Sequence, residues 1–103
     1  MDRIQKLLAM LADQPSDSFL QHALALEYVK AGDDERARNR FQALLSADPG
    51  YVGSYYHLGK LLERQGEDEA AISVYRKGME VAQAAGEKHA YGELRGALEE
   101  LEF

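Results

Sequence analysis

Residues 24–41, LALEYVKAGDDERARNRF, decide the fold, because their pattern returns at residues 58–75 as LGKLLERQGEDEAAISVY. Aligned residue by residue, the two stretches share a leucine, a glycine, two of the acidic residues after the glycine and an aromatic residue. Extended backward, the same alignment places Pro15 on Pro49. Self-similarity at a fixed period is typical of proteins built from stacked repeats. The sequence therefore predicts one structural unit that occurs twice.

Each unit is predicted to contain two helices joined by a short turn. The apolar side chains of the first unit have the spacing of helix faces, at Leu20, Leu24, Tyr28, Ala37, Phe41, Leu44 and Leu45. Gly32 interrupts this pattern and suits the left-handed conformation that commonly follows a helix. Asp33 comes next and is a favourable cap for the second helix. The second unit has the same arrangement of a glycine followed by acidic residues, with Gly66 ahead of three of them.

This pattern resembles the tetratricopeptide repeat, a helix–turn–helix of about 34 residues. The first unit matches it at Leu24, Ala25, Tyr28, Ala37, Phe41 and Pro49, and the second at Tyr55, Leu58, Gly59, Leu62, Ala71, Tyr75 and Gly78. The first unit departs from it at Gln21 and Leu44, and the second departs at Gln83, where proline is expected. The small residues of the pattern are expected to let the two helices of a unit approach closely.

The resemblance covers nearly the whole chain and implies an all-α fold, a right-handed α-α superhelix in a single domain, 1–103. Two hairpins are expected, flanked by a half-repeat helix at the N-terminal end and a capping helix at the C-terminal end. The predicted bounds are 2–14 for the first helix, 18–51 and 52–85 for the repeats, and 87–102 for the capping helix. Arg3 stands where the repeat pattern has alanine, so looser packing is expected there.

Composition restricts the kinds of partner. The chain has 12 lysines and arginines against 18 aspartates and glutamates, for a formal net charge of −6. Such a protein repels phosphate backbones, so neither nucleic acid nor a membrane is an expected partner.

The chain contains no cysteine, which excludes disulfides and cysteine-based zinc sites. No apolar run reaches membrane-spanning length, and we expect a cytoplasmic protein.

The sequence contains none of the spacings typical of phosphate loops, nucleophile triads or metal sites. No enzymatic activity, cofactor or metal is therefore expected. His22 and His57 lack a ligand-type residue four positions away and are interpreted as surface or groove residues. The run of Arg36, Arg38 and Arg40 is expected on the outer side of its helix, with a phosphate site as a minor alternative.

The resemblance implies that a partner protein binds, as a peptide segment or helix, in the concave groove lined by the first helix of each repeat. The residues expected to bind it are Phe19, His22, Leu26, Lys30, Tyr56, His57, Lys60 and Arg64. The last helix is expected to add His89, Gly92, Glu93, Gly96 and Glu99. Because the groove is expected to combine apolar with basic side chains, we expect a segment carrying apolar and acidic residues.

Two questions stay open on sequence alone. The chain is either an adaptor that binds a foreign partner, or a self-associating scaffold or structural domain of a larger assembly. In a homodimer, the second copy would cover Phe19 and Tyr56. Gly92 and Gly96 either allow a partner backbone to come close or simply weaken their helix.

Overall fold

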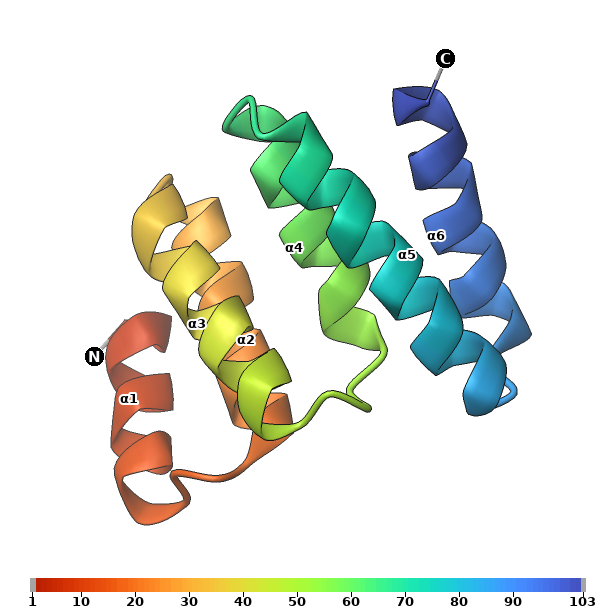
Figure 1. Cartoon of the computed structure of the whole chain (residues 1–103). Helices are drawn as coiled ribbons and strands as arrows, with labels where there is room; N and C mark the ends of the chain where they lie inside the picture. The colour runs from red at the N-terminus through yellow and green to blue at the C-terminus, as the bar shows by residue number, and fades with distance from the viewer. Residues whose placement is uncertain (1, 103) are drawn as a thin grey trace. The chain divides into compact units, whose positions relative to one another are not determined.

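The computed structural model describes residues 2–102, and this part of the chain is helical throughout apart from its turns (Figure 1). The helices are α1 (Arg3–Asp13), α2 (Ser18–Lys30), α3 (Asp34–Ala47), α4 (Gly53–Arg64), α5 (Asp68–Ala84) and α6 (Lys88–Leu101). The predicted all-α fold is thereby confirmed. The contacts group the helices into two compact units that divide after Asp48, here called the N-terminal unit (α1–α3) and the C-terminal unit (α4–α6). That the two form a single domain stays a prediction.

The N-terminal unit is a hairpin of α2 and α3 with α1 packed on α2. The turn of the hairpin works as the sequence predicts: Gly32 has a φ of 77°, and the Asp33 carboxylate accepts a hydrogen bond of 3.2 Å from the backbone N–H of Arg36. The core of this unit consists of Leu7, Leu11, Leu20, Ala23, Leu24, Ala25, Tyr28, Ala37, Phe41 and Leu44.

The departure of α1 from the repeat pattern has a visible consequence. Arg3, which stands in the place of an alanine, is largely exposed, and its Nε lies 3.2 Å from Glu27 Oε2 on α2. The helix begins with a capping box between Asp2 and Gln5. Packing of α1 on α2 therefore rests on Leu7 and Leu11 together with an ion pair at the rim.

The C-terminal unit contains the hairpin of α4 and α5, and α6 packs against both helices (Figure 1). Gly59 explains how closely α4 and α5 approach, because a Cβ atom at this position would lie 2.6 Å from Cζ of the buried Tyr75 ring. Gly78 likewise leaves room for Tyr55. The expectation that small residues permit close helix packing is confirmed.

The predicted ends of the helices are close to those observed. The first helix, expected over 2–14, spans Arg3–Asp13, and the last, expected over 87–102, spans Lys88–Leu101. Without a proline at Gln83, α5 continues to Ala84, and the chain turns at Gly86, whose φ is 72°.

Candidate functional site

On α2, the residues predicted to bind a partner lie at intervals of three or four positions, which places them on one side of the helix. Asp17 caps this helix by accepting a hydrogen bond of 3.0 Å from the backbone N–H of Leu20, so Phe19 lies in its first turn. The Phe19 side chain is 67% exposed, and Leu26 is half-buried on the same side. A phenylalanine this exposed provides apolar surface that the folded chain does not use.

The other two predicted residues of α2 are engaged within the N-terminal unit. The half-buried His22 ring packs edge-to-face on Phe41, with the ring centroids 5.9 Å apart. The Lys30 ammonium lies 3.4 Å from Glu27 Oε2, the same oxygen that Arg3 contacts. The positive charge expected at Lys30 is therefore partly compensated.

On α4, Lys60 is the centre of a polar cluster in the C-terminal unit. Its Nζ atom lies 5.7 Å from the centroid of the Tyr56 ring, 3.7 Å from Glu63 Oε2 and 4.0 Å from Glu100 Oε2 on α6. The hydroxyl of the buried Tyr75 donates a hydrogen bond to Glu63. Burial raises the pKa of Tyr75 well above its ordinary value, so this hydroxyl is protonated and stays a donor.

His57 lies on the same helix beside this cluster. Its ring packs edge-to-face on Tyr56, with centroids 5.7 Å apart. Neighbouring atoms displace part of the water around the imidazole and lower its pKa, while the carboxylate of Glu93 on α6 opposes the shift. Arg64, the fourth predicted residue of α4, is exposed one turn beyond Lys60.

The structure thus brings Phe19, His22, Leu26 and Lys30 to one helix of the N-terminal unit, and Tyr56, His57, Lys60 and Arg64 to one helix of the C-terminal unit. The role of Glu100 was missed by sequence reasoning, because no local spacing relates it to Lys60. The predicted basic character is weaker than expected, since two carboxylates share the Lys60 ammonium.

The predicted residues of α6 have mixed surroundings. A Cβ atom added at Gly92 or Gly96 would meet nothing within 4 Å, so these glycines have no packing role in the described chain. Glu99 Oε1 accepts a hydrogen bond of 2.8 Å from Arg95 on its own helix. His89 is exposed.

Residues 2–102 contain neither a metal-binding cluster nor a membrane-spanning helix. Among residues 2–102, no three histidine or acidic side chains gather in a way that would hold a metal ion. None of the helices in this part of the chain has both the length and the apolar character needed to cross a membrane.

Comparison with known proteins agrees with this geometry. Residues 22–86 match the family model described as tetratricopeptide repeat. A TPR repeat-containing protein of Pseudomonas aeruginosa is 31% identical over 99 residues, which cover 96% of this chain and 94% of that protein. The chain belongs to the tetratricopeptide repeat (TPR) family.

Solved structures of similar proteins support the assignment. A TPR domain protein from Salinibacter ruber, known from a crystal structure, is 43% identical with a TM-score of 0.81, over 84% of this chain and 96% of that one. A protein of Bordetella parapertussis, known from a solution structure, is 29% identical with a TM-score of 0.84, over 98% of this chain and 88% of that one. TPR repeats are in general protein–protein interaction modules, and proteins of the family are generally non-enzymatic scaffolds.

Proposed function

We propose that this TPR chain is an adaptor that binds a partner protein through the exposed side of α2 in the N-terminal unit and, as a separate contact, through the Lys60 cluster on α4 in the C-terminal unit. The observation that carries the proposal is the 67% exposure of Phe19. Fully burying a side chain of this size contributes about 1.5–3 kcal/mol, and about two-thirds of the Phe19 surface is left for a partner to cover. A partner that covers Phe19 and the exposed part of Leu26, about two turns further along α2, gains the apolar burial that the folded chain leaves unused.

The charges on α4 indicate what else the partner carries. Lys60 is 39% exposed, whereas Glu100, its more distant carboxylate partner at 4.0 Å, is 75% exposed. An exposed ion pair of this kind contributes only about 0–1 kcal/mol. A carboxylate of the partner therefore replaces Glu100 on Lys60 at little cost. The partner is accordingly expected to present an apolar side chain to α2 and an acidic side chain to α4.

The test begins with selection of binding peptides from a displayed library on the full chain, followed by calorimetric titration of the best peptide. Phe19→Ala is expected to weaken binding at least about tenfold, which corresponds to about 1.4 kcal/mol. Met10→Ala is the matched control, because Met10 on α1 is also an exposed apolar residue, at 51%. Equal affinities of the wild type and Phe19→Ala would refute the proposal for α2.

The contact at α4 has its own measurement. Lys60→Gln is expected to reduce the dependence of the affinity on salt, because screening acts on the ion pair that this variant lacks. A salt dependence that stays unchanged would show that Lys60 does not contact the partner.

The alternative, a self-associating scaffold, rests on a different observation. Within residues 2–102, the large apolar side chains that are exposed, Leu8, Met10 and Phe19, all belong to the N-terminal unit. Light scattering at high protein concentration separates the two functions. A monomer is expected for the adaptor, whereas a stable dimer that Phe19→Asp dissociates would favour self-association.

A further inference from the structure

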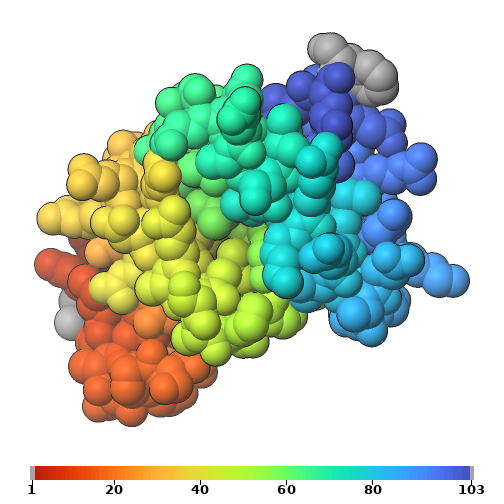
Figure 2. All heavy atoms as spheres, viewed as in Figure 1, coloured from red at the N-terminus to blue at the C-terminus, as the bar shows by residue number. Residues whose placement is uncertain are grey.

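A shallow notch on the N-terminal unit lies between the end of α2 and the outer side of α3. It is lined by Tyr28, Arg36, Asn39, Arg40 and Ala43. Figure 2 shows side chains of α3, in yellow, at the surface of this unit. Two guanidinium groups one helical turn apart flank the notch, and no carboxylate belongs to its lining, although the chain as a whole is acidic.

The two guanidinium groups are oriented by bonds that leave donors available. Arg40 Nη1 donates to the neutral Gln21 Oε1 at 3.3 Å, and Arg36 Nη1 lies 3.0 Å from Asp33 Oδ2. A guanidinium has five N–H donors, so each arginine keeps several for a ligand. The side-chain hydrogen bond of Arg40 therefore goes to a neutral amide oxygen and not to a carboxylate.

The second repeat shows that helix packing does not require these arginines. When the two repeats are aligned, Arg36 corresponds to Ala70 and Arg40 to Val74, and both of these are half-buried apolar residues. The hairpin of α4 and α5 forms without any cation at these places. The fold of a repeat therefore does not require Arg36 and Arg40.

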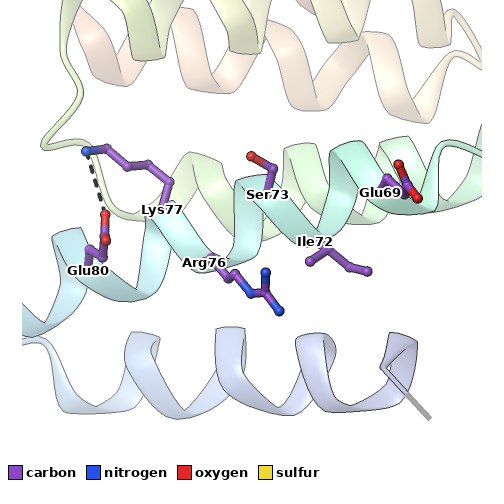
Figure 3. Close-up of a pocket in the computed structure, with 6 residues that line it drawn as sticks. All are labelled: Glu69, Ile72, Ser73, Arg76, Lys77 and Glu80. Atoms are coloured by element: carbon purple, nitrogen blue, oxygen red, sulfur yellow. Dashed lines mark ion pairs between the residues drawn. The ribbon is translucent and has the colours of Figure 1, made fainter.

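A second notch, on α5, shows what a compensated surface looks like. It is lined by Glu69, Ile72, Ser73, Arg76, Lys77 and Glu80 (Figure 3). Two carboxylates belong to its lining, Lys77 lies 3.8 Å from Glu80, and Arg76 lies 3.0 Å from Glu102. An added anion would meet these carboxylates, so the notch on α5 is unsuited to anions.

We propose that the notch on α3 binds a phosphate monoester. Such a group carries nearly two negative charges at neutral pH and has three strong acceptor oxygens, which suit two guanidinium groups and the amide of Asn39. Two carboxylates, Asp33 and Glu35, line an adjoining hollow together with Arg36 and Asn39, so the dianion binds against their charge and depends on Arg40 in particular. Nucleic acid is disfavoured as the source of the phosphate, because the net charge of −6 repels a phosphate polymer.

The proposal is independent of partner binding on α2 and is tested on the full chain by nuclear magnetic resonance. Inorganic phosphate, O-phosphoserine and a short phosphoserine peptide are titrated at pH 7.5 and low salt. Saturating shifts of backbone amides in residues 36–43 are expected with phosphate and with O-phosphoserine, with a Kd of about 1–10 mM, because exposed ion pairs are individually weak. Saturation with the phosphopeptide would identify a partner protein as a source of the group.

The variants decide whether the notch is responsible. Arg40→Gln is expected to weaken binding at least about fivefold, and Arg40→Lys to have an intermediate effect, since lysine keeps the charge but loses the planar fork. Arg38→Gln is the matched control, because it removes the same charge from the same helix outside the notch. Circular dichroism verifies that each variant is folded. Shifts that do not saturate, or equal losses in Arg38→Gln and Arg40→Gln, would mean a non-specific ionic effect only and overturn the proposal.

Discussion

Replacing glycine by alanine at two positions of the C-terminal unit is expected to change stability in opposite directions. In an exposed helix, alanine is favoured over glycine by about 1 kcal/mol, because glycine loses more backbone entropy on folding. Gly92 on α6 is such a position, since an added Cβ atom meets nothing within 4 Å. At Gly59 on α4, the added atom overlaps the ring of Tyr75 and would lie 2.6 Å from its Cζ and 2.7 Å from its Cδ1.

The Tyr75 ring is not free to move aside. Its side chain is fully buried, and its hydroxyl donates a hydrogen bond to Glu63. Adding volume to a filled core typically costs about 1–3 kcal/mol. Because the ring is held in place, we expect a cost in the upper part of that range, about 2–3 kcal/mol. After subtracting about 1 kcal/mol of helix propensity, Gly59→Ala is expected to destabilise the protein by about 1–2 kcal/mol. Gly92→Ala, which has no steric cost, is expected to stabilise it by about 0.5–1 kcal/mol.

Urea and thermal unfolding, followed by circular dichroism, measure the difference between the two variants. In a chain of this size, 1 kcal/mol corresponds to about 4–8 °C in Tm. Gly59→Ala should therefore melt below the wild type by at least about 4 °C, and Gly92→Ala above it by a few degrees. A Gly59→Ala protein as stable as the wild type would refute the packing argument. A destabilised Gly92→Ala protein would show that the space at α6 is not open.

A third expectation concerns the start of α5. The Glu67 side chain makes no hydrogen bond at this cap. At the equivalent place in the first repeat, the Asp33 carboxylate caps α3 by accepting a hydrogen bond from the backbone N–H of Arg36. Glu67→Asp should therefore raise the unfolding free energy by about 0.5–1 kcal/mol in urea titrations. An unfolding free energy equal to that of the wild type would show that the shorter aspartate carboxylate does not reach the helix N-terminus. A fourth concerns pH. His57 is exposed, but neighbouring atoms displace part of the water around its ring and lower its pKa, so the unfolded chain takes up the proton at a higher pH than the folded chain. Stability should therefore fall as the pH drops below the ordinary histidine value of about 6.5. His57→Gln should flatten this dependence, and an unchanged slope would assign it to other groups.

The turns and the helix hairpins could be predicted from the sequence because their determinants are local. Gly32 and Gly66 take up positive φ where the apolar spacing stops, and Asp33 caps the helix that follows. The hydrogen bond between Tyr75 and Glu63 could not be predicted from the sequence, because it joins α5 to α4 and depends on how the two helices pack.

The candidate site was only partly predictable for the same reason. Helical spacing identifies which residues share a side of α2 or α4, but it does not say how exposed each one is. His22 was expected as a groove residue and is half-buried against Phe41, whereas Phe19 on the same helix is largely exposed. The charge around Lys60 was misjudged, because its carboxylate partner Glu100 comes from α6.

Comparison of the two repeats with each other distinguishes packing from recognition. Positions that serve packing keep their chemistry from one repeat to the next, as Phe41 and Tyr75 do at fully buried places. On the sides of α2 and α4 proposed to bind a partner, the chemistry changes instead: Phe19 corresponds to Gly53, and Leu26 to Lys60. Packing therefore does not dictate these side chains, and each repeat is free to present a different surface. The partner surface that each unit binds is therefore expected to differ, apolar at α2 and polar at α4.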